Sequence, residues 1–86
     1  MPIKMFYSTI SAEVLRICRA SSNFDFFRSA CKPFLHRMIR QGAKKDATRN
    51  SITTLVFRHS KEFGKFQHPK EQLVNTIINL VIWQIN

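Results

Sequence analysis

The fold is decided by one short stretch of the chain, which reads Arg37-Met38-Ile39-Arg40-Gln41-Gly42-Ala43-Lys44-Lys45. Glycine adopts positive φ without a steric penalty, so the glycine here predicts that a helix ends immediately before it. Arg37 and Arg40 fall in the last turn of that helix, where positive side chains interact favourably with the helix dipole. The stretch therefore predicts two helices joined by a tight turn.

Apolar residues on both sides of this turn recur at the three- and four-residue spacing of helices. The spacing predicts helices over about residues 9–20, 24–40 and 44–60. A fourth hydrophobic segment begins at Pro69, because proline favours the first position of a helix. Residues 80–83 are apolar on every side, and they fit a helix or a short strand.

Three local signals refine this outline. Pro33 lies inside the second helix and removes a backbone donor, which predicts a kink or a short break. Ser22 followed by Asp25 resembles a capping box at the start of the same helix. Phe63 and Phe66 flank a short turn, and we expect both rings to fold back on the core.

A chain of 86 residues forms one small domain, and we predict an all-α fold. Residues 1–67 are expected to form a three-helix bundle resembling a helix-turn-helix. Residues 68–86 are expected to form a hydrophobic helix, or a short strand, that packs on this bundle or forms an interface.

The composition is strongly basic, with 14 Lys and Arg against 5 Asp and Glu and a net charge of +9. Hydrophobic residues make up 44% of the chain, more than a disordered basic tail contains. The charge predicts a polyanionic partner, nucleic acid first and an anionic membrane surface second. The sequence has no recognisable secretory signal, no apolar stretch long enough to span a membrane and only two cysteines. We therefore expect an intracellular protein, nuclear or cytoplasmic.

Residues suited to catalysis or metal binding are scattered along the chain. The five acids occupy separate segments, and no two are spaced as an acid–base pair. Cys18, Cys31 and the three histidines lack the close pairs of structural zinc sites. Each cysteine falls on an apolar stripe, which indicates a buried free thiol. We expect no enzymatic activity, no metal and no cofactor.

Six cationic residues lie in or after the central turn, and they are the candidate nucleic-acid contacts: Arg37, Arg40, Lys44, Lys45, Arg49 and Arg58. Lysine and arginine neutralise phosphates and release counterions, so such a group favours binding to a nucleic-acid backbone. The alternative is the solvated face of a helical bundle. For Arg58 and His59 we favour a structural role, in which Arg58 caps carbonyls or pairs with Glu62. His59 would then pack against the turn that carries Phe63 and Phe66.

Several blocks of the chain follow the order and spacing of a known domain. These blocks are residues 6–20, Asn23-Phe24-Asp25-Phe26-Phe27, Leu35-His36-Arg37-Met38-Ile39-Arg40-Gln41-Gly42-Ala43 and Leu55-Val56-Phe57-Arg58-His59, followed by Phe63 and Phe66. Over about residues 5–67 the chain resembles the helix-turn-helix domain that follows the polymerase and thumb regions of animal retroelement reverse transcriptases, Penelope-like ones among them. The resemblance implies a domain that holds template or primer nucleic acid beside a polymerase, mainly through its backbone.

The chain departs from this family in two respects. No polymerase core precedes the matching blocks, so the catalytic aspartates of the family are absent, and residues 72–86 match no part of it. We therefore expect a detached, non-catalytic nucleic-acid-binding module. A retroelement remnant without a selected function is the alternative.

The apolar tail over residues 73–85 permits two further interpretations. It forms a homodimer or protein-interaction surface through Leu73, Ile77, Val81 and Trp83, because small domains often cover such patches by association. Alternatively, the tail and the positive charge together make a cationic amphipathic protein that lies on a membrane surface. We favour packing or self-association over the membrane.

Overall fold

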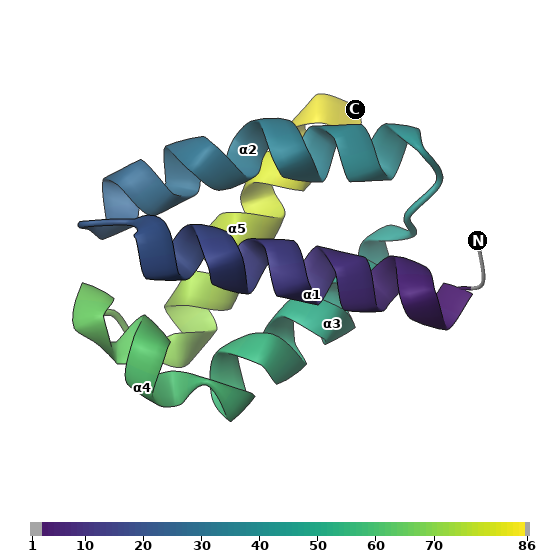
Figure 1. Ribbon diagram of the computed structural model, residues 1–86. Helices are drawn as coiled ribbons and strands as arrows, with labels where there is room; N and C mark the ends of the chain where they lie inside the picture. The colour runs from purple at the N-terminus through teal and green to yellow at the C-terminus, as the bar shows by residue number, and fades with distance from the viewer. Residues whose placement is uncertain (1–2, 86) are drawn as a thin grey trace.

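The computed structural model describes the backbone of residues 3–85 and the side chains of residues 6–80 (Figure 1). Its elements are α1 (Ile3–Ala20), α2 (Phe24–Arg40), α3 (Lys45–Arg58), α4 (Ser60–Phe63), the 3-10 helix η1 (Gly64–Phe66) and α5 (Lys70–Ile85). No strand occurs within residues 3–85, so the all-α prediction is confirmed. The segment that fitted either a helix or a strand is helical as far as Ile85.

The four long helices pack around one core. α1 and α2 lie side by side and run in opposite directions, and α5 crosses behind them in the view of Figure 1. α2 packs on α1 and α5, and α3 packs on the same two helices. The molecule therefore has two distinct ends. We use the name α4 end for residues 59–68 together with the adjoining end of α1 and start of α2. We use the name turn end for residues 40–45 together with the adjoining start of α1.

Each long helix buries the apolar stripe that its spacing predicts. Ile10, Val14, Ile17 and Cys18 of α1 are all buried. The other helices contribute Phe27, Cys31, Leu35, Ile52, Val56, Leu73, Val74, Ile77 and Ile78. Burying a side chain of this size contributes about 1.5–3 kcal/mol each, so a domain this small depends on nearly all of them.

Two residues of the expected homodimer surface belong to this core. Leu73 is 1% exposed and Ile77 is fully buried, because α5 turns this face toward α2 and α3. In this fold they contact the rest of the chain, so they are not available to a second copy. The side chains of Val81 and Trp83, named with them, lie outside the described residues.

The second helix spans the predicted residues, but two of its local details differ from expectation. Asn23, not Ser22, is the N-cap, and its side-chain oxygen accepts a hydrogen bond from the backbone N–H of Phe26 at 2.8 Å. α2 also continues through Pro33 without a break. Pro33 and Ser29 are both exposed, so solvent can reach the carbonyl that lacks a helical donor.

The turn after α2 is a Schellman motif. Gly42 has a φ of 105°, and its N–H donates to the carbonyl of Ile39 at 3.0 Å. The N–H of Ala43 donates to the carbonyl of Met38 at 3.1 Å, and these two side chains are buried together with the core. The motif satisfies carbonyls that a helix end leaves without donors, so the glycine predicted as the helix stop is confirmed.

The third helix is shorter than its sequence suggests, and it buries a partly different set of side chains. It ends at Arg58, and His59 separates it from α4, because the chain bends there toward the end of α1. The apolar spacing over residues 44–60 predicts a polar side that includes Thr48, but this side chain is 1% exposed and its hydroxyl has no hydrogen-bond partner. The same spacing predicts a buried side that includes Ala47 and His59, but both are only partly buried. Ile52, Leu55 and Val56 are buried as the spacing predicts, so the weakly amphipathic sequence misplaced only part of the buried face.

The α4 end is held by a cluster of aromatic rings, in which one pair is stacked and the others are edge-to-face or tilted. The ring of Phe27 lies 5.3 Å from that of Phe66 and 5.9 Å from that of Phe63, measured between centroids. The ring of Phe24 lies 5.6 Å from that of Phe66 and 4.7 Å from the imidazole of His68. The expectation that Phe63 and Phe66 fold back on the core is confirmed, and aromatic pairs of this geometry add stability beyond their buried area.

Candidate nucleic-acid interface

Three of the six candidate cations gather at the turn end. Arg40 is the last residue of α2, Lys44 precedes α3 and Lys45 is its first residue. The side chains of Arg40 and Lys44 are exposed, and that of Lys45 is half-buried. The backbone N–H of Lys44 donates to the hydroxyl of Tyr7 at 3.4 Å, so α1 helps to fix the turn. Within residues 6–80 none of the three forms an ion pair.

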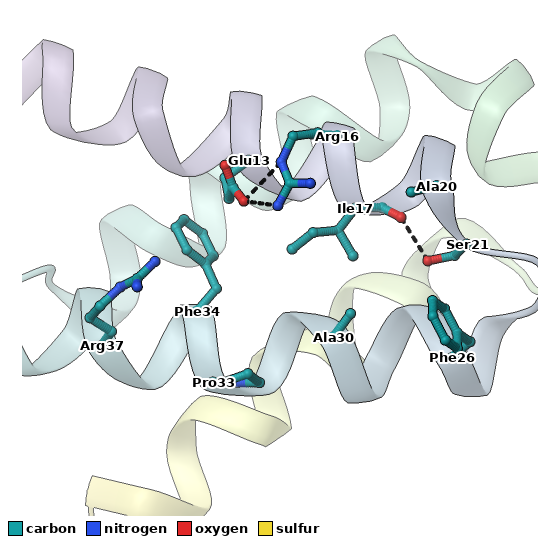
Figure 2. A pocket seen from close by; sticks show the side chains of 10 residues that line it. All are labelled: Glu13, Arg16, Ile17, Ala20, Ser21, Phe26, Ala30, Pro33, Phe34 and Arg37. Carbon is teal, nitrogen blue, oxygen red and sulfur yellow. Dashed lines mark hydrogen bonds and ion pairs between the residues drawn. The ribbon is translucent and has the colours of Figure 1, made fainter.

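Arg37 lies on the side of α2 that faces α1. It lines a groove between the two helices beside Phe34, and its guanidinium carbon is 5.7 Å from the centre of that ring (Figure 2). Across the groove, Glu13 of α1 binds Arg16 in an ion pair. The hydrogen bond from Arg16 lowers the pKa of Glu13, and the charge of Arg37 adds a smaller effect in the same direction. Arg37 therefore borders the turn end, but part of its charge acts on Glu13 across the groove.

Arg49 lies on the opposite side of the turn end, where α3 meets α5. Its Nη1 donates to the side-chain oxygen of Asn75 at 3.1 Å, and the arginine is half-buried. Asparagine is neutral, so this contact orients the guanidinium without cancelling its charge. Lys45 precedes Arg49 by four residues and therefore lies on the same side of α3.

Arg58 is separated from the other five candidates. It is thirteen residues beyond Lys45 on one helix, which places it roughly 20 Å away at 1.5 Å per residue. It lines a second groove, between α3 and α1, with Tyr7 and Leu15 on the other wall. The expected pairing of Arg58 with Glu62 does not occur, because Glu62 turns toward α1.

Glu62 instead ties α4 to α1. Its carboxylate accepts hydrogen bonds from Nε of Arg19 at 2.9 Å and from Nη2 of Arg19 at 3.1 Å, and the imidazole of His59 lies 3.8 Å away. The hydrogen bond from Arg19 lowers the pKa of Glu62. Nearby, the ammonium of Lys65 donates to the backbone carbonyls of Cys18 and Ser21 and so caps the end of α1.

Charge is distributed unevenly between these regions. From residue 26 to residue 45 the chain has no Asp or Glu, and it carries six cations: Arg28, Lys32, Arg37, Arg40, Lys44 and Lys45. None of the six forms an ion pair within the described part of the chain. Arg28 and Lys32 were not among the sequence candidates, although their four-residue spacing to His36 and Arg40 marks one row along α2.

The described residues contain no group of three or more His, Cys, Asp or Glu side chains that could hold a metal ion. Cys18 and Cys31 are buried, and their thiols are free. Burial raises the pKa of both thiols, which makes the reactive thiolate scarce. None of the helices in residues 3–85 is both long enough and apolar enough to cross a bilayer.

No protein-family model matches this chain, and no curated protein or solved structure matches it either. The candidate interface is therefore assessed on its own geometry and charge.

Proposed function

We propose that the protein is a non-catalytic nucleic-acid-binding module that holds the sugar–phosphate backbone at its turn end. The observation that carries this proposal is the group of cations at the turn, Arg40, Lys44 and Lys45, none of which forms an ion pair within residues 6–80. Arg40 and Lys44 form its exposed centre. The resemblance to the accessory domain of retroelement reverse transcriptases, with its helix-turn-helix arrangement, points to the same partner.

Electrostatics favours a polyanion for this region. Cations held together without acids repel one another, and a phosphate backbone removes that repulsion while releasing its condensed counterions. Contacts of this kind position the partner but carry little sequence information. We therefore propose binding to many sequences with similar affinity.

A membrane surface fits the described residues less well. The apolar side chains of α5 that would enter a bilayer include Leu73, Val74, Ile77 and Ile78, and all four are buried in the core. A surface-bound helix needs an exposed apolar face beside its cations. The cations of the turn end have no such face next to them within residues 6–80.

The test is the affinity of the full chain for short duplex and single-stranded nucleic acids over a salt series. With six phosphate contacts, affinity falls by about 10³-fold or more between roughly 50 and 200 mM salt. Arg40→Gln combined with Lys44→Gln weakens binding to all sequences alike and lowers the salt slope by about 2.

Arg16→Gln combined with Lys61→Gln is the matched control. It removes the same charge from exposed positions at α1 and α4, away from the turn. It is expected to change affinity far less than the Arg40 and Lys44 pair. Absent or salt-independent binding by the unaltered protein overturns the proposal, as does an equal loss in both double variants.

A further inference from the structure

We infer that the face formed by α5 and the flanks of α2 and α3 is a second contact surface for the nucleic-acid backbone, continuous with the turn end. This inference rests on the proposed function and adds to it the side of the molecule on which the partner lies. It identifies contact residues that neither the sequence candidates nor the turn end include, chiefly Arg28, Lys32 and Lys70.

The first flank is a row of residues at four-residue spacing along α2. Its two outer members contact the α5 side: the ring of Phe24 is 4.7 Å from that of His68, and Nε2 of His36 donates to the carbonyl of Leu80 at 2.7 Å. Arg28 and Lys32 lie between these anchors, so they point along the same edge of α5. Both are exposed, and neither has an ion-pair partner within the described residues.

The second flank comes from α3. Arg49 reaches across to Asn75 of α5, and the ammonium of Lys70 lies 5.3 Å from the centre of the Phe57 ring. These two contacts show that α3 and α5 run antiparallel here, with Lys45 and Arg49 along their shared edge. Phe57 is 45% exposed, so an apolar ring face with a cation above it borders the same edge.

Between the flanks, α5 presents amides. Gln72, Asn75 and Asn79 are exposed at three- and four-residue spacing, and they form a ridge along the helix. Amide side chains both donate and accept hydrogen bonds, and they are common contacts to phosphates and base edges. The acids at the borders of this face are Asp25, Asp46 and Glu71, in the first turns of α2, α3 and α5. Cations therefore outnumber acids along it.

The dimensions suit a backbone that crosses the face. Arg28 and Arg40 are about 18 Å apart along α2 at 1.5 Å per residue, and helices pack about 8–10 Å apart, so the cations of α2 and of α3 lie on either side of α5 where it crosses them. A nucleic acid lying over α5 would meet cations on both sides and amides in the middle. The shared chemistry is the phosphodiester backbone, and either a duplex or a single strand supplies it.

The test compares Arg28→Gln/Lys32→Gln with the Arg16→Gln/Lys61→Gln control in the full chain. Each variant removes two exposed charges from helices, and glutamine is a good helix former, so the fold is preserved. Circular dichroism verifies this, and Lys32→Glu alone serves as a second variant. We expect the Arg28 and Lys32 pair to lose about tenfold or more in affinity at low salt, and the salt slope to fall by about 1–2.

The outcomes separate this inference from the proposed function. If the unaltered protein does not bind duplex or single-stranded nucleic acid, both fall. Suppose instead that the protein binds, that the Arg40→Gln/Lys44→Gln variant weakens binding, and that the Arg28→Gln/Lys32→Gln variant behaves as the control. This result excludes the contact surface over α5 but leaves the proposed function in place. A tenfold loss confined to the duplex, or confined to the single strand, supports the face and identifies the form that it binds.

Discussion

The α4 end and the turn end of the molecule (Figure 1) both carry arginine and lysine, but the side chains of these residues form different contacts. At the α4 end, two cations form contacts that join elements: Arg19 binds Glu62, and Lys65 caps the carbonyls that end α1. At the turn end, Arg40 and Lys44 project into solvent without partners within the described residues. An exposed acid, Asp46, also adjoins the turn end, so the difference lies in which cations form contacts within the fold.

This contrast indicates which charges serve the fold. The α4 end carries a cluster of rings beside its ion pairs, so its cations join elements that are already packed. The turn end is fixed by backbone geometry at Gly42 and by buried Met38 and Ala43, and the side chains of Arg40 and Lys44 form no hydrogen bond or ion pair within the described residues. Charges that are clustered but join no elements of the fold are candidates for binding.

The largest expected effect on stability comes from removing a buried ring at the α4 end. Phe27 is fully buried between Phe63 and Phe66, so Phe27→Ala is expected to lower the free energy of unfolding by about 3–5 kcal/mol. Denaturant unfolding measures this loss. Phe26, one residue earlier and 57% exposed, is the matched control, and Phe26→Ala is expected to cost about 0.5 kcal/mol or less. Equal losses in the two variants would contradict the packing described for this end.

The next effect compares the two glycines, one at each end. Gly42 has a φ of 105°, so Gly42→Ala is expected to destabilise the fold by about 1 kcal/mol, although a Cβ there would meet no atom within 4 Å. Gly64 has a φ of −62°, so Gly64→Ala is expected to be neutral or stabilising. Thermal unfolding of both variants checks the contrast. A stabilised Gly42→Ala protein would exclude the Schellman turn.

Replacing a buried hydroxyl on α3 is expected to raise stability, in contrast to the two preceding changes. Thr48 is buried without a hydrogen-bond partner, so its desolvated hydroxyl lowers stability. Thr48→Val keeps the shape and the β-branch, and it is expected to raise the free energy of unfolding by roughly 1 kcal/mol. Thr53→Val is the control, because the Thr53 hydroxyl donates to the carbonyl of Arg49. If Thr48→Val were destabilising, the buried placement of this face of α3 would be wrong.

The smallest effect concerns the ion pair between Arg19 and Glu62. The pKa of Glu62 is lowered, so its carboxylate stabilises the fold at pH values above its ordinary pKa, and this stabilisation disappears as the pH falls through the lower folded-state value. Arg19→Gln is expected to lower the melting temperature slightly near neutral pH and to flatten this acid-side dependence. High salt reduces the difference because the pair is exposed. Arg40→Gln is the unpaired control, and it is expected to leave the acid-side profile unchanged.

The sequence predicted the helices well where one strong pattern decided them. The α2 span and the glycine stop were identifiable because the apolar stripe, Gly42 and the terminal arginines agree. The bend at His59 and the burial of Thr48 were not, because α3 is weakly amphipathic and its orientation is set by packing against α1 and α5. Asn23 and Ser22 are adjacent candidates for one cap, and the packed start of α2 chooses between them.

The candidate interface was predicted in part. Arg40, Lys44 and Lys45 are close in sequence, and a tight turn necessarily keeps them together. Arg58 was grouped with them by sequence proximity, although it lies at the far end of α3. Arg28 and Lys32, which we propose as further contacts, could not be placed beside α5 from the sequence, because the sequence does not indicate which edge of α2 meets α5. That placement depends on the contacts of Phe24 and His36 with distant residues.

The most direct test of the central claim, that the unpaired cations and not the paired ones bind nucleic acid, is a titration followed by amide chemical shifts. The unaltered protein is titrated at low salt with a short duplex and with a single strand. The predicted result is a set of shifts concentrated at residues 28–32, 40–45 and 70–79, which disappear as salt is added, while residues 59–66 stay unchanged. Shifts centred on the α4 end, or no shifts at low salt, would contradict the claim.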